Sequence, residues 1–144
     1  MNVVIMGCGR TGASVAARLA GEGHGVTVID TSESSFRRLP ASFNGKRTVG
    51  SGMDQRVLEA AGLRQADAFM ALAQGDNRNV FAAQVAMHVF GVRNAVVRLN
   101  DPFRSEIFSR LGLRTFSPTI VGVDLAYRAL MGPPPPVPPV DEAP

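Results

Sequence analysis

A regular alternation of short β-branched runs with helical segments is the feature that most constrains this chain. The runs predict strands at residues 2–6, 26–30, 46–49, 67–72, 95–98 and 113–116. The segments between and after them predict helices at 10–21, 32–39, 54–61, 77–90, 102–111 and 118–131. Strand–helix units in this succession predict an α/β fold of the Rossmann-like, doubly wound type. We therefore expect a mostly parallel six-stranded sheet with helices on both faces.

The bulk composition is that of one ordinary globular domain. Hydrophobic residues make up 45% of the 144 positions and charged residues 19%, which is typical of a soluble chain with a full core. We expect a single domain over residues 1–131. The composition changes abruptly after Met131, where residues 132–144 read GPPPPVPPVDEAP. Proline lacks the backbone donor, so this stretch predicts a disordered tail or the remnant of a linker.

Charge and cysteine content narrow the classes of partner. The net charge is only +3, and the fifteen basic residues are scattered rather than clustered, so we expect no binding to nucleic acid. Cys8 is the sole cysteine, which indicates a reducing compartment. The first residues lack the basic start of a signal peptide, and no apolar run is long enough to span a bilayer. The expectation is a cytoplasmic protein without direct membrane insertion.

Residues 7–12 read GCGRTG, a G-x-G-x-x-G that follows a predicted strand and opens a predicted helix. In a dinucleotide-binding turn, the first glycine permits the tight bend and the second lets a pyrophosphate approach the backbone. The third glycine lets the helix pack close to the sheet. The helix N-terminus then offers unpaired N–H groups to phosphate. The alternative is a glycine turn needed only for packing. The candidate phosphate loop comprises Gly7, Cys8, Gly9, Arg10, Thr11 and Gly12.

Asp30 ends the second predicted strand, where a carboxylate can accept both hydroxyls of an adenosine ribose. The same charge repels a 2′-phosphate, so NADP(H) is disfavoured. NAD(H) or another adenine nucleotide with a free ribose 2′-hydroxyl, such as ATP or ADP, is favoured. The alternative is that Asp30 caps a helix over 32–39. Arg10 either reaches a further phosphate or remains a solvated residue at the helix start.

Four stretches together resemble the nucleotide-binding RCK domain, also called TrkA-N. They read VVIMGCGRTGASVAARLAGEGHGVTVID, VGSGMDQRVLEAAGLRQADAFMAL, GDNRNVFAAQVA and VVRLNDPFRSEIFSRLGLRTFSPT. The resemblance implies binding of NAD(H) or ATP/ADP by a cytoplasmic subunit that gates a membrane potassium channel or transporter. It also implies that relatives continue into a smaller C-terminal domain, whereas a polyproline stretch follows here.

The resemblance places further residues beside the ligand. It implies that the stretch beside the adenine is Ser51, Gly52, Met53 and Asp54, and that the loop after the fourth strand contributes Ala73, Gln74 and Asn79. Arg98 matches a basic residue that ends the fifth strand, near the ligand and the dimer contact. The chain departs from the family where Ser51 replaces the usual Asp and Ala73 the usual Thr, which leaves NAD(H) and ATP/ADP unresolved.

An enzyme would need an acid or base positioned near the reacting atoms. The Tyr-x-x-x-Lys pair of single-domain reductases is missing, because Tyr127 and Lys46 are the only Tyr and Lys and lie far apart in sequence. No spacing of histidines suggests a metal site. We therefore expect a nucleotide sensor without catalytic activity. The alternative is the cofactor-binding domain of an NAD-dependent oxidoreductase.

The segment 118–131 is apolar around most of its circumference, which predicts packing against a second copy of the chain. A homodimer or a multiple of dimers is the expected assembly, and in the resembling family this helix crosses to a neighbouring subunit. In the segment 102–111, Phe103, Ile107 and Leu111 lie on one stripe. Phe108 lies off that stripe and either faces a partner or belongs to a broad core face.

Overall fold

The sheet has the strand order expected of a doubly wound fold. The computed structural model describes residues 1–133. Its strands are β1 (Asn2–Met6), β2 (Gly25–Asp30), β3 (Lys46–Val49), β4 (Ala68–Ala71), β5 (Asn94–Arg98) and β6 (Arg114–Phe116). They pair in the order β3-β2-β1-β4-β5-β6, and every pair is parallel. The predicted Rossmann-like fold is confirmed, with an entirely parallel sheet in place of a mostly parallel one.

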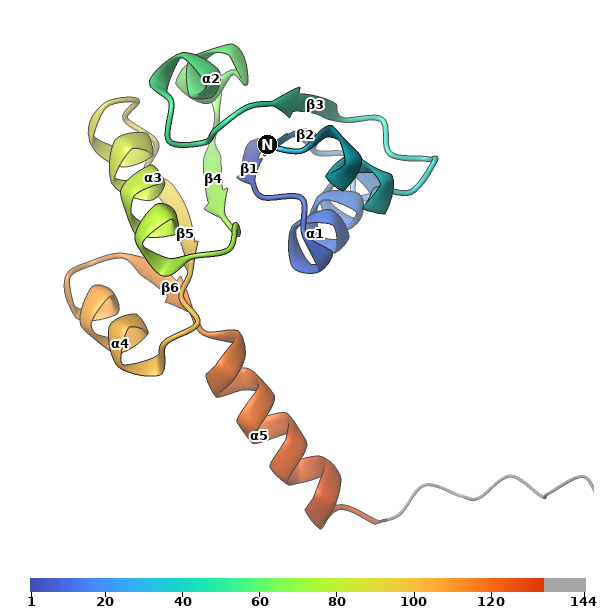
Figure 1. The fold of residues 1–144 in the computed structure, drawn as a ribbon, viewed down its shortest axis with the longest axis vertical. Coiled ribbons are helices and arrows are strands. Elements are labelled where there is room, and N and C mark those ends of the chain that lie inside the picture. The colour runs from blue at the N-terminus through green and yellow to red at the C-terminus, as the bar shows by residue number, and fades with distance from the viewer. Residues whose placement is uncertain (134–144) are drawn as a thin grey trace, which may run out of the picture.

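Within residues 1–133, five α-helices connect and follow the strands (Figure 1). They are α1 (Arg10–Gly21), α2 (Gln55–Ala60), α3 (Asp76–His88), α4 (Pro102–Arg110) and α5 (Pro118–Met131). The prolines that begin α4 and α5 follow Asp101 and Ser117, whose side chains accept hydrogen bonds from the first-turn N–H groups. The predicted starts of these two helices, at residues 102 and 118, are therefore confirmed.

The predicted helix at 32–39 is wrong in type. This segment forms a 3₁₀ turn, η1 (Glu33–Arg38), and a second, unpredicted 3₁₀ turn, η2, spans Leu63–Gln65. Serine side chains favour local hydrogen bonds over a continuing helix. Here the hydroxyls of Ser32 and Ser34 form a hydrogen bond of 2.8 Å with each other. Pro40 then prevents extension.

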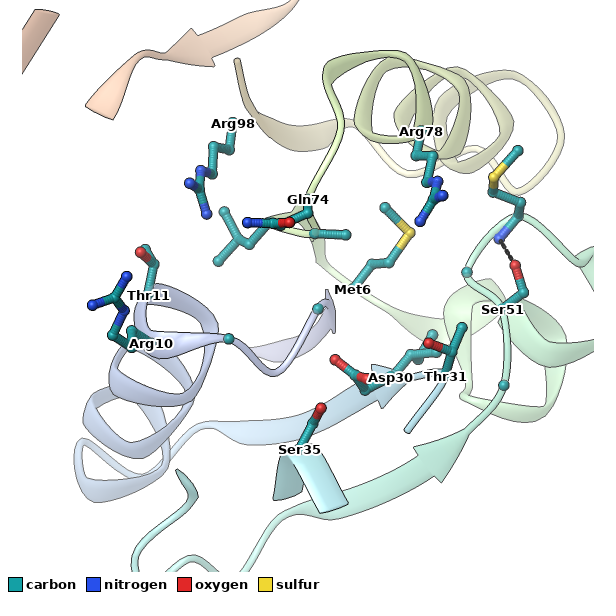
Figure 2. A pocket seen from close by; sticks show the side chains of 18 of the residues that line it. Met6, Arg10, Thr11, Asp30, Thr31, Ser35, Ser51, Gln74, Arg78 and Arg98 are labelled. Carbon is teal, nitrogen blue, oxygen red and sulfur yellow. Dashed lines mark hydrogen bonds between the residues drawn. The ribbon is translucent and has the colours of Figure 1, made fainter. Parts of the chain in front are cut away.

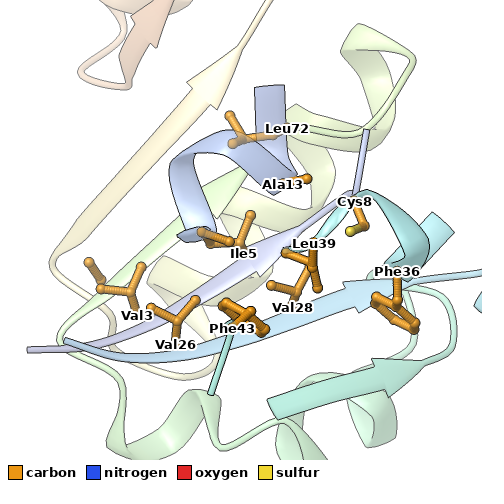
Figure 3. Packing of buried hydrophobic residues seen from close by; sticks show 12 residues of the cluster. Val3, Ile5, Cys8, Ala13, Val26, Val28, Phe36, Leu39, Phe43 and Leu72 are labelled. Carbon is orange, nitrogen blue, oxygen red and sulfur yellow. The ribbon is translucent and has the colours of Figure 1, made fainter. Parts of the chain in front are cut away.

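The two faces of β1 pack into different parts of the core. Val3 and Ile5 belong to a cluster formed with β2, α1 and the segment around η1 (Figure 3). Val4 and Met6 point to the opposite face and pack with residues of α2, α3 and β4. Because neighbouring residues of a strand point to opposite faces, this division shows that helical segments cover both sides of the central strand.

The last two helices leave much apolar surface exposed. No residue of α5 is buried, and Leu130 is 81% exposed. In α4, Phe108 packs against the core cluster that includes Val97, whereas Phe103 is 70% exposed and Leu111, just after the helix, is 72% exposed. The core-face alternative for Phe108 is therefore the one observed, and the stripe from Phe103 to Leu111 faces outward.

In Figure 1, α5 extends from the end of β6 away from the rest of the domain. Within residues 1–133, none of the helices has both the length and the hydropathy needed to cross a membrane. The tail predicted over 132–144 lies almost wholly outside the residues that the structure describes.

The turn from β1 into α1 depends on two glycines. Gly7 has φ of 101°, and a Cβ there would lie 2.7 Å from the backbone of Ala73. A Cβ on Gly12 would lie 1.9 Å from the carbonyl oxygen of Gly7. Gly9 is different, because a Cβ on it would meet no atom within 4 Å. The fold therefore requires glycine at positions 7 and 12, whereas Gly9 leaves unoccupied space beside the loop.

We expect Gly12→Ala to lower the free energy of unfolding by about 1–3 kcal/mol, because the added methyl group overpacks two backbone segments. Alanine has the higher helix propensity, so a loss of stability here reports packing alone. Gly9→Ala is the matched control and should change stability by less than about 0.5 kcal/mol. Urea denaturation followed by circular dichroism measures both variants at one protein concentration. Equal stabilities would contradict the packing role of Gly12.

Candidate functional site

A cavity of about 780 Å³ opens at the carboxyl ends of the central strands (Figure 2). Its wall includes the last residues of β1 and β2, residues 72–74 just after β4, and Arg98 at the end of β5. The chain leaves β1 toward one edge of the sheet and β4 toward the other, so this is the topological switch point of the fold. Open parallel sheets bind their ligands at this position.

Most of the sequence-predicted site residues meet in the wall of this cavity. They are Gly7, Gly9, Arg10, Thr11, Asp30, Ser51, Gly52, Met53, Ala73, Gln74 and Arg98. The remaining four, Cys8, Gly12, Asp54 and Asn79, do not line it. The set therefore comes from three loops that are distant in sequence, after β1, β3 and β4, and from the ends of β2 and β5.

The glycine loop presents a helix N-terminus to the cavity. Gly9 is the N-cap of α1, and no side chain accepts a hydrogen bond from the first turn of this helix. No acidic residue occupies that turn either. Unpaired N–H groups and the positive end of the helix dipole suit an anion such as phosphate.

The carboxylate of Asp30 is held in a fixed orientation. Its Oδ2 accepts a hydrogen bond from the N–H of Cys8 at 2.8 Å, and its Oδ1 accepts one from the N–H of Ser32 at 2.9 Å. A carboxylate oxygen can accept two hydrogen bonds, so each oxygen retains one lone pair for a ligand hydroxyl. The N-cap residue of η1 is Ser32, so the alternative in which Asp30 caps that segment is not the geometry observed.

Cys8 and Gly12 support the cavity from behind. The Cys8 side chain is fully buried in the cluster between β1, β2 and α1. Burial raises the pKa of its thiol, and the neighbouring Asp30 carboxylate raises that pKa further. A neutral, buried thiol is a packing group rather than a reactive one. The backbone N–H of Cys8 orients Asp30, and Gly12 contacts the Gly7 carbonyl as described above.

Asp54 and Asn79 are both engaged within the protein. Asp54 caps α2 by accepting a hydrogen bond from the N–H of Arg56, and the Arg56 guanidinium holds the pKa of the Asp54 carboxyl below its ordinary value. Asn79 is buried, and its Nδ2 donates to the carbonyls of Ala73 and Arg98, each at 2.9 Å. Asn79 thereby ties the ends of β4 and β5 together beneath the cavity.

The sequence analysis missed several residues of the wall. Met6, Ile29, Thr31, Ser35, Arg38, Gly50, Leu72 and Arg78 also line the cavity. Arg38 ends η1, and Arg78 lies in the first turn of α3. A signal was present, because helices that follow parallel strands begin at the same edge of the sheet. This signal could have found Arg78, whereas Arg38 lies at the end of η1 and carries no such signal.

A hydrogen-bonded network connects the cavity to the start of α5. The Arg98 Nε donates to the Oδ1 of Asn100 at 3.1 Å, and the N–H of Asn100 donates to Asp76 at 2.9 Å. The carbonyl of Asn100 accepts hydrogen bonds from the hydroxyls of Ser117, at 3.3 Å, and Thr119, at 2.7 Å. Asn100 therefore contacts a cavity residue, the start of α3 and the base of α5.

Comparison with known proteins identifies the family. The family model described as the TrkA-N domain matches residues 3–118. The chain belongs to the TrkA-N domain family. It is 47% identical over 131 residues to the Trk system potassium uptake protein TrkA of Streptomyces coelicolor, an alignment covering 91% of this chain and 59% of that protein. This chain thus spans about three fifths of the curated relative it matches, and the predicted family resemblance is confirmed.

Solved structures share the fold at low sequence identity. The TrkA-N domain of the inner membrane protein YbaL from Escherichia coli superposes with a TM-score of 0.78 at 14% identity, over 90% of this chain and 96% of that chain. The Shewanella denitrificans Kef CTD in its AMP-bound form gives 0.75 at 24% identity, over 91% and 80%. The GsuK channel bound to NAD gives 0.76 at 23% identity, over 90% and 23%, and GsuK has also been solved bound to ADP.

Proposed function

We propose that this chain is a cytoplasmic adenine-nucleotide sensor that regulates a membrane potassium transporter or channel. The observation that carries the proposal is the cavity at the switch point, with the open N-terminus of α1 beside the oriented carboxylate of Asp30. The potassium-transport part is supported by the TrkA relative, and the nucleotide part by the AMP, ADP and NAD of the structural neighbours.

The cavity supports a role in binding rather than reaction. Among its described wall residues, Asp30 is the sole carboxylate, and both of its oxygens already accept backbone hydrogen bonds. Lys46 is on the edge strand β3 and Tyr127 on the outlying α5, and neither belongs to the cavity wall. This arrangement offers no positioned acid–base pair of the kind an oxidoreductase requires, so we favour the sensor over the dehydrogenase alternative.

Binding is tested with Gly9→Ala, because the methyl group would enter the open space beside the loop without meeting protein atoms. Isothermal titration with ATP, ADP, AMP, NAD and NADH should show binding by the wild type and at least a tenfold loss, or about 1.4 kcal/mol, in the variant. Gly21→Ala is the matched control, since its methyl group also meets nothing but lies at the far end of α1. A wild-type protein that binds none of these nucleotides would refute the proposed function.

A sensor must also change something outside its binding site. The candidate element is α5, which buries no residue and joins the domain through Ser117 and through the hydrogen bond from Thr119 to Asn100. Arg98 contacts the side chain of the same asparagine. We propose that a ligand contacting Arg98 alters the anchoring of α5 through Asn100.

Thr119→Val tests this route, because it removes the hydroxyl that donates a hydrogen bond to the Asn100 carbonyl while preserving the shape of the side chain. In the wild type, nucleotide should change the hydrogen exchange of amides in residues 120–125. In the variant, nucleotide affinity should stay within twofold while at least half of that exchange response is lost. Thr48→Val is the matched control, since Thr48 lies in β3 on the other side of the sheet. An undiminished response in Thr119→Val would exclude the route through Asn100.

The exposed side chains of α5 support a homodimer or a multiple of dimers. Val123, Leu125 and Leu130 are all more than half exposed in the single chain. A surface of this kind on a soluble protein is typical of an interaction site. A second copy that covers α5 would bury these residues, and a nucleotide-dependent movement of α5 would then reorient one subunit against the other.

Leu125→Glu should dissociate the assembly, because an unpaired charge buried in an interface costs several kcal/mol. The side chain is exposed in the single chain, so circular dichroism should show an intact fold. Val89→Glu, at the exposed apolar residue that follows α3, is the control for a nonspecific effect of the charge. Sedimentation velocity measures all three proteins. A wild type that sediments as a folded monomer at micromolar concentration would refute the dimer.

A further inference from the structure

The cavity has two ends with different chemistry. Figure 2 shows Arg10 and Arg98 toward one end of the cavity and Arg78 toward the other. Asp30, whose carboxylate suits ribose hydroxyls, lies between the two ends. A nucleotide whose ribose contacts Asp30 and whose phosphates contact the glycine loop therefore directs its base toward Arg78. The residues that line this second part of the wall, which we call the base end, are Met6, Ser51, Gly52, Met53 and Arg78.

The base end contains hydrogen-bond donors but no carboxylate among the wall residues that the structure describes. Asp54 follows this stretch in the chain, yet it does not line the cavity, because it caps α2 and binds Arg56. The Oγ of Ser51 accepts a hydrogen bond from the N–H of Met53 at 3.2 Å. The hydroxyl proton of Ser51 is therefore available to a ligand. A base is best matched here when it accepts hydrogen bonds rather than donates them.

Arg78 is the strongest donor of the base end. It lies in the first turn of α3, and Figure 2 shows its side chain directed toward Met6 and the loop that carries Ser51. The ion pairs described within residues 1–133 use other arginines, and the exposed Arg78 guanidinium makes no hydrogen bond with any residue that the structure describes. Because arginine carries a planar fork of N–H donors and no acceptor, the whole fork remains available for a base.

Purine bases differ in what they offer to such a fork. Guanine presents two neighbouring acceptors, N7 and O6, which an arginine contacts with two parallel hydrogen bonds. Adenine presents N7 beside its 6-amino group, which is a donor. With adenine, one N–H of the guanidinium therefore faces the amino group of the base without a partner. A freely available arginine at the base end favours a base with an oxygen at position 6.

We propose that the cavity binds guanine nucleotides at least as tightly as adenine nucleotides, and that Arg78 is the residue that determines this specificity. The Arg78 guanidinium donates to O6 and N7 of the base. This inference rests on the proposed nucleotide-binding function and widens it from adenine to purine nucleotides. The contacts of Asp30 and the glycine loop are the same for both ligands, because they involve the ribose and the phosphates rather than the base.

The test is isothermal titration of the wild type, Arg78→Met and Arg78→Lys with ADP, GDP and inosine diphosphate (IDP). IDP has the O6 and N7 of guanine without its 2-amino group. The wild type should bind GDP and IDP at least as tightly as ADP. Arg78→Met, which keeps an unbranched side chain without donors, should weaken GDP and IDP about tenfold while changing ADP less than about threefold. Arg78→Lys keeps the charge but loses the planar fork, so it should also weaken GDP more than ADP.

Arg93→Met is the matched control, since it makes the same change at an exposed residue that precedes β5, at the other end of the strands. It should leave all three affinities unchanged, and circular dichroism verifies the fold of each variant. A wild type that binds ADP but binds GDP more weakly would overturn the inference and leave the proposed function intact. Equal losses of GDP and ADP in Arg78→Met would also overturn it. A wild type that binds none of the three nucleotides would instead refute the underlying function.

Discussion

The close approach of the Gly7 carbonyl to Gly12, where a Cβ would lie 1.9 Å from the carbonyl oxygen, is the constraint on which the rest of the site depends. It lets α1 begin directly at the end of β1, because no Cβ separates the helix from the strand. The same turn brings Gly7 against the backbone of Ala73, after β4. Three backbone segments therefore meet without side chains between them. As a result, the open N-terminus of α1 lies at the cavity, between the ends of the two central strands.

Polar side chains in the first turn of α3 hold the opposite wall in place. Asn79 donates to carbonyls at the ends of β4 and β5, and Asp76 accepts from the N–H of Asn100. A segment that leaves a sheet must find partners for its backbone polar groups, and the first turn of α3 supplies them here. The chain therefore uses one helix start both to satisfy two strand ends and to place Arg78 at the cavity.

The fold was predictable from the sequence because each strand and most helices carry a local signal. Such signals are the periodic spacing of apolar residues, the glycines at turns, and a serine followed by proline at the start of α5, Ser117-Pro118. Site residues that come together from distant parts of the sequence were harder to predict. Asp54 was placed by resemblance beside the adenine, yet an N-cap hydrogen bond to Arg56 decides its position. Arg38 and Arg78 belong to no motif, and only the sheet order brings them to the cavity that holds Asp30.

The exposed helix α5 gives the proposed sensing a physical basis. A helix buried in the core would resist reorientation, because closely packed interiors do not deform continuously. Here α5 buries no residue of its own, and hydroxyls at its start bond one carbonyl, that of Asn100. Its orientation therefore depends on a few hydrogen bonds and on whatever covers its apolar surface. A nucleotide can shift that orientation only by the difference between its affinities for the two arrangements. Such a difference would arise from ligand contacts with Arg98, because the Arg98 side chain donates a hydrogen bond to Asn100, the residue that anchors α5.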